Sequence, residues 1–257
     1  MTYFDSIPRI EISHSPTLLE SAPRLSKELG CNIFIKRDDC TGLASGGNKT
    51  RKLEYLLADA NKQGADTLVT IGGVQSNHAR QTAAAAAKFG FNCELILQDV
   101  AGSPKQDYPN NGNILLDQLF GASIHRLSLD QDCDKYASEL IDKLTLDGQH
   151  PYLIPVGGSD EIGSLGYVRC AKEILEQLSE QSTKIDQIIL ATGSAGTQAG
   201  LLAGLISEKS NIPVLGINVS RSEKEQTVLV KYLLKNILKQ LNLDETLANE
   251  RVFTDGN

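Results

Sequence analysis

The sequence predicts an α/β protein assembled from parallel β-α units. From residue 33 onward, short β-rich runs alternate with helical patterns, and most of these runs are followed by turns that contain glycine. With 257 residues the chain is long enough to bury a sizeable core. Its composition, 40% hydrophobic and 22% charged, is typical of a globular protein. The alternation alone fits one doubly wound domain and two smaller lobes equally well.

The pattern places strands and helices in a definite order. We expect strands at residues 33–36, 67–71, 93–97, 123–127, 152–154, 187–190 and 214–218. The clearest helix follows Lys49, where Asn48 is expected to cap its start and Gly64 to end it. A second helix is expected over residues 78–89, which include five consecutive alanines. The polar segment 98–113 is expected to be irregular.

Charge and cysteine content exclude several classes of protein. A formal net charge of −7 and a pI near 5.2 oppose binding to nucleic acid or to anionic lipid. The five cysteines are scattered, form no Cys-x-x-Cys pair and have no histidines at metal-ligand spacing. No apolar run reaches the length of a membrane helix, and no signal peptide is visible at the N-terminus. We therefore expect a cytoplasmic protein with reduced thiols, without a metal and without a nucleic-acid or membrane partner.

The first chemical motif is the run SGGNKTRK at residues 45–52. Two glycines let the backbone approach a ligand, and Lys49 falls at a helix N-terminus. The positive end of a helix, with Arg51 and Lys52 nearby, should lower the pKa of this lysine and favour attack on a carbonyl. Taken alone, a lysine is most often a surface residue, so this interpretation depends on the other loops.

Two further loops each lie between an expected strand and an expected helix, where ligands collect in parallel α/β proteins. The run GGVQSNH at residues 72–78 offers backbone amides, a hydroxyl, an amide and an imidazole, which suits a carboxylate, although simple helix capping explains it as well. The run ATGSAGTQAG at residues 191–200 could hold a phosphate monoester or be only a tight turn. It lacks the P-loop lysine and the dinucleotide fingerprint, which weakens a nucleotide-dependent oxidoreductase.

The most specific runs are IKRDD at residues 35–39, GGNKTRKLE at residues 46–54 and QSNHARQT at residues 75–82. With these runs the chain resembles the pyridoxal phosphate (PLP) enzymes of the tryptophan synthase β fold, fold type II. The group it resembles contains D-cysteine desulfhydrase, L-cysteate sulfo-lyase and 1-aminocyclopropane-1-carboxylate deaminase. The resemblance covers almost the whole chain. It implies two lobes with parallel-sheet cores and a cofactor cleft between them.

The resemblance also implies a role for each site residue. Lys49 would attach PLP as a Schiff base, and Asn77 would contact the phenolic oxygen of the cofactor. Ser76 and His78, with Asn77, would bind the substrate carboxylate, and Ser76 would also take part in proton transfer. Lys52 would hold the phosphate together with the third loop, which consists of Gly193, Ser194, Ala195, Gly196 and Thr197.

The implied reaction is α,β-elimination on a small sulfur-containing amino acid. His78 and the run IPVGGS at residues 154–159 favour the desulfhydrase and sulfo-lyase branches over the deaminase, which remains an alternative. The run RDDCTGLA at residues 37–44 resembles the sulfo-lyase, so D-cysteine and L-cysteate both stay open as substrates. The products would be pyruvate, ammonia and either sulfide or sulfite.

The resemblance further implies a homodimer and a division of the chain into lobes. The larger lobe would contain residues 1–49 and 162–257, and the smaller lobe residues 50–161. The chain is shorter than members of this group, so the larger lobe is expected to be incomplete, with apolar surface uncovered and the residues that tune the cofactor ring missing. A truncated, non-catalytic PLP-binding remnant is therefore the remaining alternative.

Overall fold

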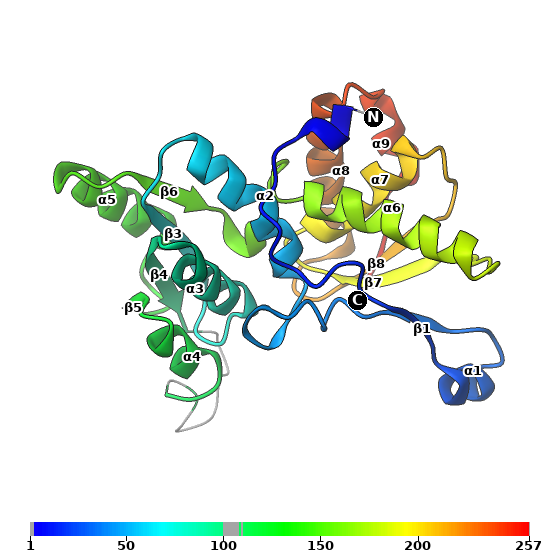
Figure 1. Ribbon diagram of the computed structural model, residues 1–257, viewed down its shortest axis with the longest axis horizontal. Helices are drawn as coiled ribbons and strands as arrows, with labels where there is room; N and C mark the ends of the chain where they lie inside the picture. Colours follow the sequence, from blue (N-terminus) through cyan, green and yellow to red (C-terminus); the bar gives the residue numbers. More distant parts are fainter. Residues whose placement is uncertain (1–2, 100–107, 109, 257) are drawn as a thin grey trace.

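The computed structural model describes residues 3–99, 108 and 110–256, so most of the segment 98–113 lies outside the described residues. Two parallel sheets form separate parts of the molecule, as Figure 1 shows. The first sheet has the order β5-β4-β3-β6 and the second has the order β7-β8-β9. These strands are β3 (Thr67–Gly73), β4 (Asn92–Gln98), β5 (Ser123–Leu127), β6 (Pro151–Ile154), β7 (Ile188–Thr192), β8 (Val214–Asn218) and β9 (Phe253–Asp255). The predicted α/β class with parallel sheets is confirmed.

All seven expected strands are present, and the structure contains two further short strands that the sequence pattern did not predict. These are β1 (Leu19–Ser21) and β9, which contain three residues each. Strand β2 (Phe34–Lys36) pairs antiparallel with β1 and so does not begin a parallel unit. The short connection between them carries only the helix α1 (Pro23–Leu29), whereas parallel neighbours require a longer crossover.

Helices cover both sheets, and α2 is shared between the two parts (Figure 1). The chain forms α2 (Lys49–Lys62), α3 (Asn77–Phe89), α4 (Asn113–Leu119), α5 (Cys133–Leu146), α6 (Leu165–Glu180), α7 (Gly196–Ser207), α8 (Glu223–Gln240) and α9 (Ala248–Arg251), with single turns at η1 (Tyr3–Ser6), η2 (Leu43–Ser45), η3 (Val156–Gly158) and η4 (Glu245–Leu247). Leu53 and Leu56 of α2 pack into the core of the first sheet. Tyr55 packs into the core formed by α6, α7 and α8. Helix α2 therefore connects the two hydrophobic cores.

One face of the second sheet exposes apolar side chains. Ile189 is 63% exposed, Ile217 39% and Phe253 51%. The strand register places these residues on the same face, because Leu215 is paired with both Ile189 and Phe253, and Ile217 lies two residues further along β8. Three apolar side chains are thus exposed on one face of this sheet.

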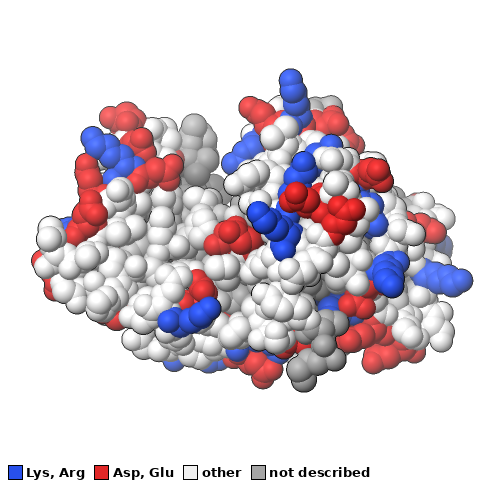
Figure 2. Space-filling model, turned by 90° about the horizontal axis from the view of Figure 1, so that it is seen from above, with Lys and Arg blue, Asp and Glu red and all other residues white. Residues whose placement is uncertain are grey.

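The surface seen in Figure 2 carries both signs of charge. Acidic and basic side chains lie interspersed on this face, and neither sign forms a continuous patch.

None of the described helices combines the length and hydropathy needed to cross a membrane.

Candidate functional site

Lys49 is the first residue of α2 and follows a turn of unusual backbone conformation. The turn has positive φ at Ala44 (49°), Ser45 (69°), Gly46 (80°) and Gly47 (132°). Positive φ is unfavourable for residues with a Cβ atom, so the first two positions need support from their surroundings. The turn places the lysine at the junction between the two parts of the molecule.

The side chain of Asn48, in the first loop, contacts Lys49 and the third loop and does not cap α2. Its Oδ1 accepts a hydrogen bond from Lys49 Nζ at 2.9 Å, and its Nδ2 donates to Thr197 Oγ1 at 3.3 Å. No side-chain capping bond is formed, so the expected capping role of Asn48 was wrong. The side chain instead joins two loops that lie far apart in the sequence.

Helix α3 holds the turn before Lys49 through Arg80 and Gln81. The guanidinium of Arg80 donates to the carbonyls of Ala44 and Gly46, the second at 3.1 Å. Gln81 Oε1 accepts from both the backbone amide and the hydroxyl of Thr50, each at 2.9 Å. The positioning roles of Arg80 and Gln81 were not predicted, although both lie in the QSNHARQT run. Only the close approach of α3 to the turn shows what these side chains do.

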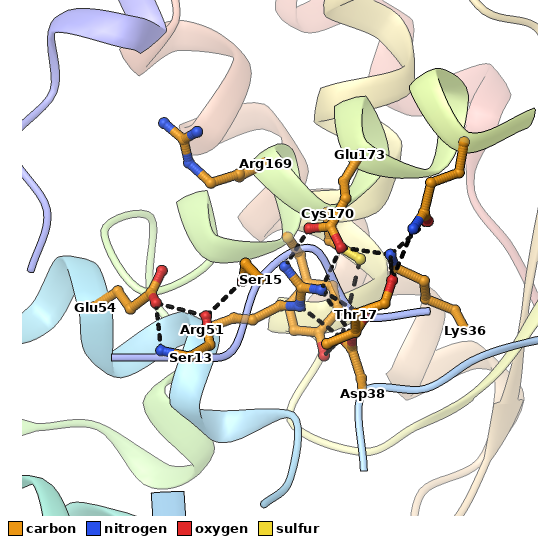
Figure 3. Close-up of polar contacts among 12 residues, drawn as sticks. Ser13, Ser15, Thr17, Lys36, Asp38, Arg51, Glu54, Arg169, Cys170 and Glu173 are labelled. Carbon is orange, nitrogen blue, oxygen red and sulfur yellow. Dashed lines mark hydrogen bonds and ion pairs between the residues drawn. The ribbon is translucent and has the colours of Figure 1, made fainter. Parts of the chain in front are cut away.

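A buried ionic network fixes the first turn of α2 against α6 (Figure 3). Arg51 is 1% exposed and lies between two carboxylates. It donates to both oxygens of Asp38, at 2.9 and 2.8 Å, and to both oxygens of Glu173, at 2.8 and 3.1 Å. Lys36 Nζ adds a contact of 2.5 Å to Glu173. Arg51 therefore anchors the helix that begins with Lys49, a role the sequence did not reveal.

The third loop and Lys52 form the strongest candidate for a phosphate site. Lys52 is 1% exposed, and its Nζ donates to the carbonyl of Gly157 at 3.0 Å and to Ser159 Oγ at 2.7 Å. A Cβ atom at Gly196, the first residue of α7, would come within 2.8 Å of this Nζ and 2.6 Å of Ser159 Oγ. The lysine thus lies against the N-terminus of α7, where backbone N–H groups attract anions.

Gly157 and Ser159 join this site without having been predicted there. Ser159 Oγ donates to Ser194 Oγ at 2.7 Å. Gly157 has φ +69°, and a Cβ atom there would come within 2.5 Å of Ser194 Oγ and 3.6 Å of Lys49 Cε. In the sequence, the IPVGGS run at residues 154–159 was used only to favour the desulfhydrase and sulfo-lyase branches over the deaminase. The structure shows that its glycine leaves room for Lys49 and the third loop to approach each other.

The first and third loops enclose one cavity of about 410 Å³. Its lining combines Lys49 with most of the predicted phosphate loop and one residue after β8. The lining residues are Asn48, Lys49, Ala191, Thr192, Gly193, Ser194, Ala195, Thr197 and Val219. The structure therefore brings two of the three predicted loops together around a common space.

Burial lowers the pKa of both lysines in the site. The pKa of Lys49 lies below the ordinary value for a lysine. The expected direction is confirmed, and its cause is the loss of hydration on burial. The pKa of Lys52 is lowered further, first by burial and then by the charge of Lys49. A neutral amine at Lys49 is thus accessible, as attack on a carbonyl requires.

Ser76 and Asn77 of the second loop lie at the start of α3. Ser76 caps this helix, because its Oγ accepts from Ala79 N at 3.2 Å. Asn77 is exposed, and its Oδ1 accepts from Asn113 Nδ2 at 3.0 Å and from Arg80 Nη2 at 3.3 Å. The capping explanation for this loop is therefore correct for Ser76. The contacts with cofactor and substrate that the sequence resemblance implies for Ser76 and Asn77 remain predictions.

His78 is buried and held in one tautomer. Its Nε2 lies 2.9 Å from Thr70 Oγ1, and the hydroxyl of Thr70 donates to the carbonyl of Ile154. Because that hydroxyl has a single proton, Nε2 must be the donor and Nδ1 must be unprotonated. Nδ1 is buried and has no partner among the described residues. Burial, with the charges of Lys49 and Lys52, lowers the pKa of His78 to about 3.

The residues present fit the PLP cofactor that the sequence resemblance implies. The two described hydrogen-bond partners of the buried Lys52 Nζ are neutral, so the charged form of this lysine lacks an anionic hydrogen-bond partner among the described residues. A phosphate group at the α7 N-terminus would supply that partner. Lys49 lines the adjoining cavity with a depressed pKa. No group of three or more metal-ligating side chains is found in the described part of the chain.

Comparison with known proteins gives consistent matches in sequence. The family described as pyridoxal-phosphate dependent enzyme matches residues 10–248. A D-cysteine desulfhydrase of Salmonella typhi is 46% identical over 239 residues, which cover 93% of this chain and 73% of that protein. A D-cysteine desulfhydrase of Serratia proteamaculans is 45% identical over 238 residues, covering 93% of this chain and 72% of that protein.

Solved structures agree with these matches. The crystal structure of an ACC deaminase homologue superposes with a TM-score of 0.85 at 40% identity, covering 94% of this chain and 72% of that one. The crystal structure of O-ureido-L-serine synthase has a TM-score of 0.65 at 17% identity and covers 88% of this chain and 66% of that one. The second match indicates a shared fold only.

Proposed function

Because this chain belongs to the pyridoxal-phosphate dependent enzyme family, we propose that it is a lyase that converts D-cysteine and water to pyruvate, hydrogen sulfide and ammonia. The identity of 46% with D-cysteine desulfhydrase, extending over 93% of the chain, carries this assignment. The residues around the cavity support it, because Lys49 and the third loop line one space and Lys52 lies against the N-terminus of α7. The reaction is an α,β-elimination that requires PLP.

Bound in this cavity, PLP supplies the electron sink that allows the Cα–H and Cβ–S bonds of an amino acid to break. We propose that Lys52, Ser159 and the amides of the third loop hold its phosphate. A dianion beside Lys52 would raise the pKa of that lysine and stabilise its charged form. The glycines at 157 and 196 keep the space that this arrangement needs.

Lys49 has two tasks in this proposal. It would attach the cofactor, and its Nζ atom would hold or move the Cα proton of the substrate. Its lowered pKa supports both tasks, because each requires a neutral amine during part of the cycle. The hydrogen bond from Lys49 Nζ to Asn48 Oδ1 orients the amine at the wall of the cavity.

The second loop would bind the substrate carboxylate. We propose that Ser76 and Asn77 donate hydrogen bonds to it and that Asn77 contacts the phenolic oxygen of the cofactor. Ser76 would also take part in proton transfer. The tautomer of His78 adds a condition, because its unprotonated Nδ1 accepts hydrogen bonds and does not donate them. Nδ1 and a carboxylate oxygen both accept hydrogen bonds, so a contact between them would require a proton shared between the two atoms.

Four assignments are finer, and all of them except the cytoplasmic location rest on the family resemblance. We propose a larger lobe of residues 1–49 and 162–257, a smaller lobe of residues 50–161, and the cofactor cleft between them. We also propose a homodimer and a cytoplasmic location, the latter supported by free thiols at all five cysteines. L-Cysteate remains a second candidate substrate, supported by the RDDCTGLA run at residues 37–44.

The experiment adds PLP to the purified protein and supplies one candidate substrate at a time. Pyruvate is measured with D-cysteine and with L-cysteate, and 2-oxobutyrate is measured with 1-aminocyclopropane-1-carboxylate. We expect pyruvate from D-cysteine, none from Lys49→Ala, and full activity from Lys143→Ala, which removes an exposed lysine of α5. Turnover of only L-cysteate or only the cyclopropane would reassign the substrate. A visible cofactor band without any turnover would identify a non-catalytic PLP-binding protein.

A further inference from the structure

A buried threonine in the segment before the Lys49 turn binds both polar backbone groups of Gly47. Thr41 is 0% exposed. Its Oγ1 accepts a hydrogen bond from the backbone N–H of Gly47 at 2.9 Å and donates one to the carbonyl of the same glycine at 2.8 Å. These two groups belong to the peptide units on either side of the Gly47 Cα atom. One hydroxyl group therefore fixes the orientation of two consecutive peptide units.

The neighbouring hydroxyl of Thr50 is committed to another partner. It donates its single proton to Gln81 Oε1 at 2.9 Å, so it can only accept from Thr41 Oγ1, which lies 3.1 Å away. The amide of Gln81 is held in turn, because its Nε2 donates to the carbonyl of Asn77 at 2.8 Å. Hydrogen bonds thus continue from Thr41 through Thr50 and Gln81 to the second loop.

The backbone around Thr41 is also fixed. The carbonyl of Thr41 accepts from His14 N at 3.0 Å. A Cβ atom at Gly46 would collide with the carbonyl oxygen of Asp39 and would come within 3.2 Å of Thr41 N, so this segment lies directly against the turn. The β-branched side chain of threonine has few χ1 rotamers, which limits the entropy lost in holding the hydroxyl there.

The turn needs this support because its backbone conformation is unfavourable. All residues from 44 to 47 have positive φ, and such a series persists only where the surroundings hold it. Arg80 of α3 contacts two carbonyls in the first part of the turn. Thr41 contacts its last residue, Gly47, two positions before Lys49. A change in the peptide units of Gly47 would therefore be passed on to Lys49.

We propose that Thr41 is a positioning residue: its hydroxyl fixes both peptide units of Gly47 and thereby sets the direction in which the turn presents Lys49 to the cavity. This inference rests on the proposed function, because it assigns importance to the Lys49 turn. The contact lies within the protein itself, so its effect on the turn can be measured without cofactor or substrate.

The test compares Thr41→Val, which keeps the shape of the side chain and removes its hydroxyl, with Thr41→Ser, which keeps the hydroxyl. NMR measures amide hydrogen exchange of Gly46 and Thr50 in the full chain without added cofactor. These two amides bond to Leu43 and Gln81 and not to Thr41, so they report on the turn and not on the deleted bond. Exchange of both should accelerate at least about fivefold in Thr41→Val, because the variant leaves the polar groups of Gly47 without their partner. In Thr41→Ser it should stay within about twofold of the wild type.

Thr82→Val is the matched control. Thr82 is also 0% exposed, but its Oγ1 has no hydrogen-bond partner among the described residues. This control should leave the exchange of Gly46 and Thr50 unchanged, and the amides of α8 should exchange alike in all four proteins. The proposal would be overturned by less than about fivefold acceleration in Thr41→Val, by an equal effect of Thr41→Ser or Thr82→Val, or by equal acceleration in α8. If Thr41→Val does not fold, Thr41→Ala replaces it in the same comparison.

A PLP titration connects the turn to the site. The dissociation constant for PLP should rise at least about fivefold in Thr41→Val and stay within about twofold of the wild type in Thr41→Ser. A smaller rise in Thr41→Val would overturn the positioning role, even with accelerated exchange. A wild type that does not bind PLP would refute the proposed function alone, and the exchange measurement would then decide whether Thr41 holds the turn.

Discussion

At the scale of single residues, the proposed phosphate site depends on a buried lysine whose described hydrogen-bond partners are neutral. Lys52 is the clearest case, because its ammonium is buried against neutral groups at a helix N-terminus. Such a position is unfavourable without an anion and becomes favourable when a phosphate binds. The charged form of Lys52 is therefore disfavoured in the cofactor-free protein, in agreement with the lowered pKa of this lysine.

Lys52→Gln tests this argument through cofactor affinity. We expect the dissociation constant for PLP to rise by about 10- to 100-fold, because a charged hydrogen bond to phosphate contributes about 1.5–3 kcal/mol. A titration followed by visible absorbance measures the constant. Lys143→Ala, on the exposed surface of α5, should bind PLP like the wild type. Unchanged affinity in Lys52→Gln would place the phosphate elsewhere.

His78 links the site to the pH dependence of stability. Its pKa is about 3 in the folded state and about 6.5 when exposed, so only the unfolded chain takes up the proton between these values. The free energy of unfolding should therefore fall, on this account, by about 1.4 kcal/mol for each pH unit below 6.5. The stabilising contribution is fully present above pH 6.5 and is lost on acidification towards pH 3.

Urea unfolding of the wild type and of His78→Gln between pH 7.5 and 5 measures this contribution. Glutamine keeps a donor for Thr70 but cannot titrate, so the variant should lose less stability than the wild type as the pH falls. His150→Gln, at an exposed position, is the matched control and should follow the wild type. Parallel curves for all three proteins would show that His78 does not stay neutral.

At the scale of elements, α2 is the helix on which the site depends. It begins with Lys49, presents Lys52 to the third loop, and is fixed by Arg51 between Asp38 and Glu173. Breaking a buried ion pair leaves an uncompensated charge, which costs more than the pair itself contributes.

Arg51→Met should therefore lower the free energy of unfolding by about 3–5 kcal/mol. The matched control is Arg37→Met, which breaks the more exposed pairs with Glu20 and Asp39 and should cost less than about 1 kcal/mol. Chemical denaturation of both variants gives the comparison. Equal losses of stability would contradict the special role of the buried network.

The sequence predicted the parallel strands and the three loops because these are local patterns. Alternating runs, glycine-rich turns and the Lys49 motif are each visible within a short stretch of chain. The supporting residues were missed because their roles come from contacts far along the chain. Arg80 holds Ala44 across 36 residues, and Ser159 reaches Ser194 across 35. Asn48 was misassigned because its Oδ1, the atom that would cap the helix, accepts from Lys49 Nζ, while its Nδ2 donates to Thr197.

At the scale of the whole molecule, the exposed face of the second sheet is the main departure from a closed surface. Ile189, Ile217 and Phe253 lie on this face and are each more than one-third exposed. Contiguous apolar surface of this kind promotes association and binding of apolar dyes. This face belongs to the β7-β8-β9 sheet, the second of the two parallel sheets.

The double variant Ile189→Ser, Phe253→Ser should bind less of an apolar fluorescent dye than the wild type and should self-associate less at high concentration. Dye titration and light scattering measure the two effects. The control is Leu146→Ser, which removes an isolated exposed leucine at the end of α5 and should change neither. Dye binding that is identical in all three proteins would show that this face is covered in solution.

The central claim is that Lys49 is the residue that attaches PLP. Borohydride reduction of the protein with bound PLP, followed by peptide mass mapping, tests it most directly. We predict that the phosphopyridoxyl group is recovered on the peptide that contains Lys49, on that lysine alone, and that Lys49→Ala carries no label. Recovery of the group on Lys52, or no stable label on the wild type, would contradict the claim.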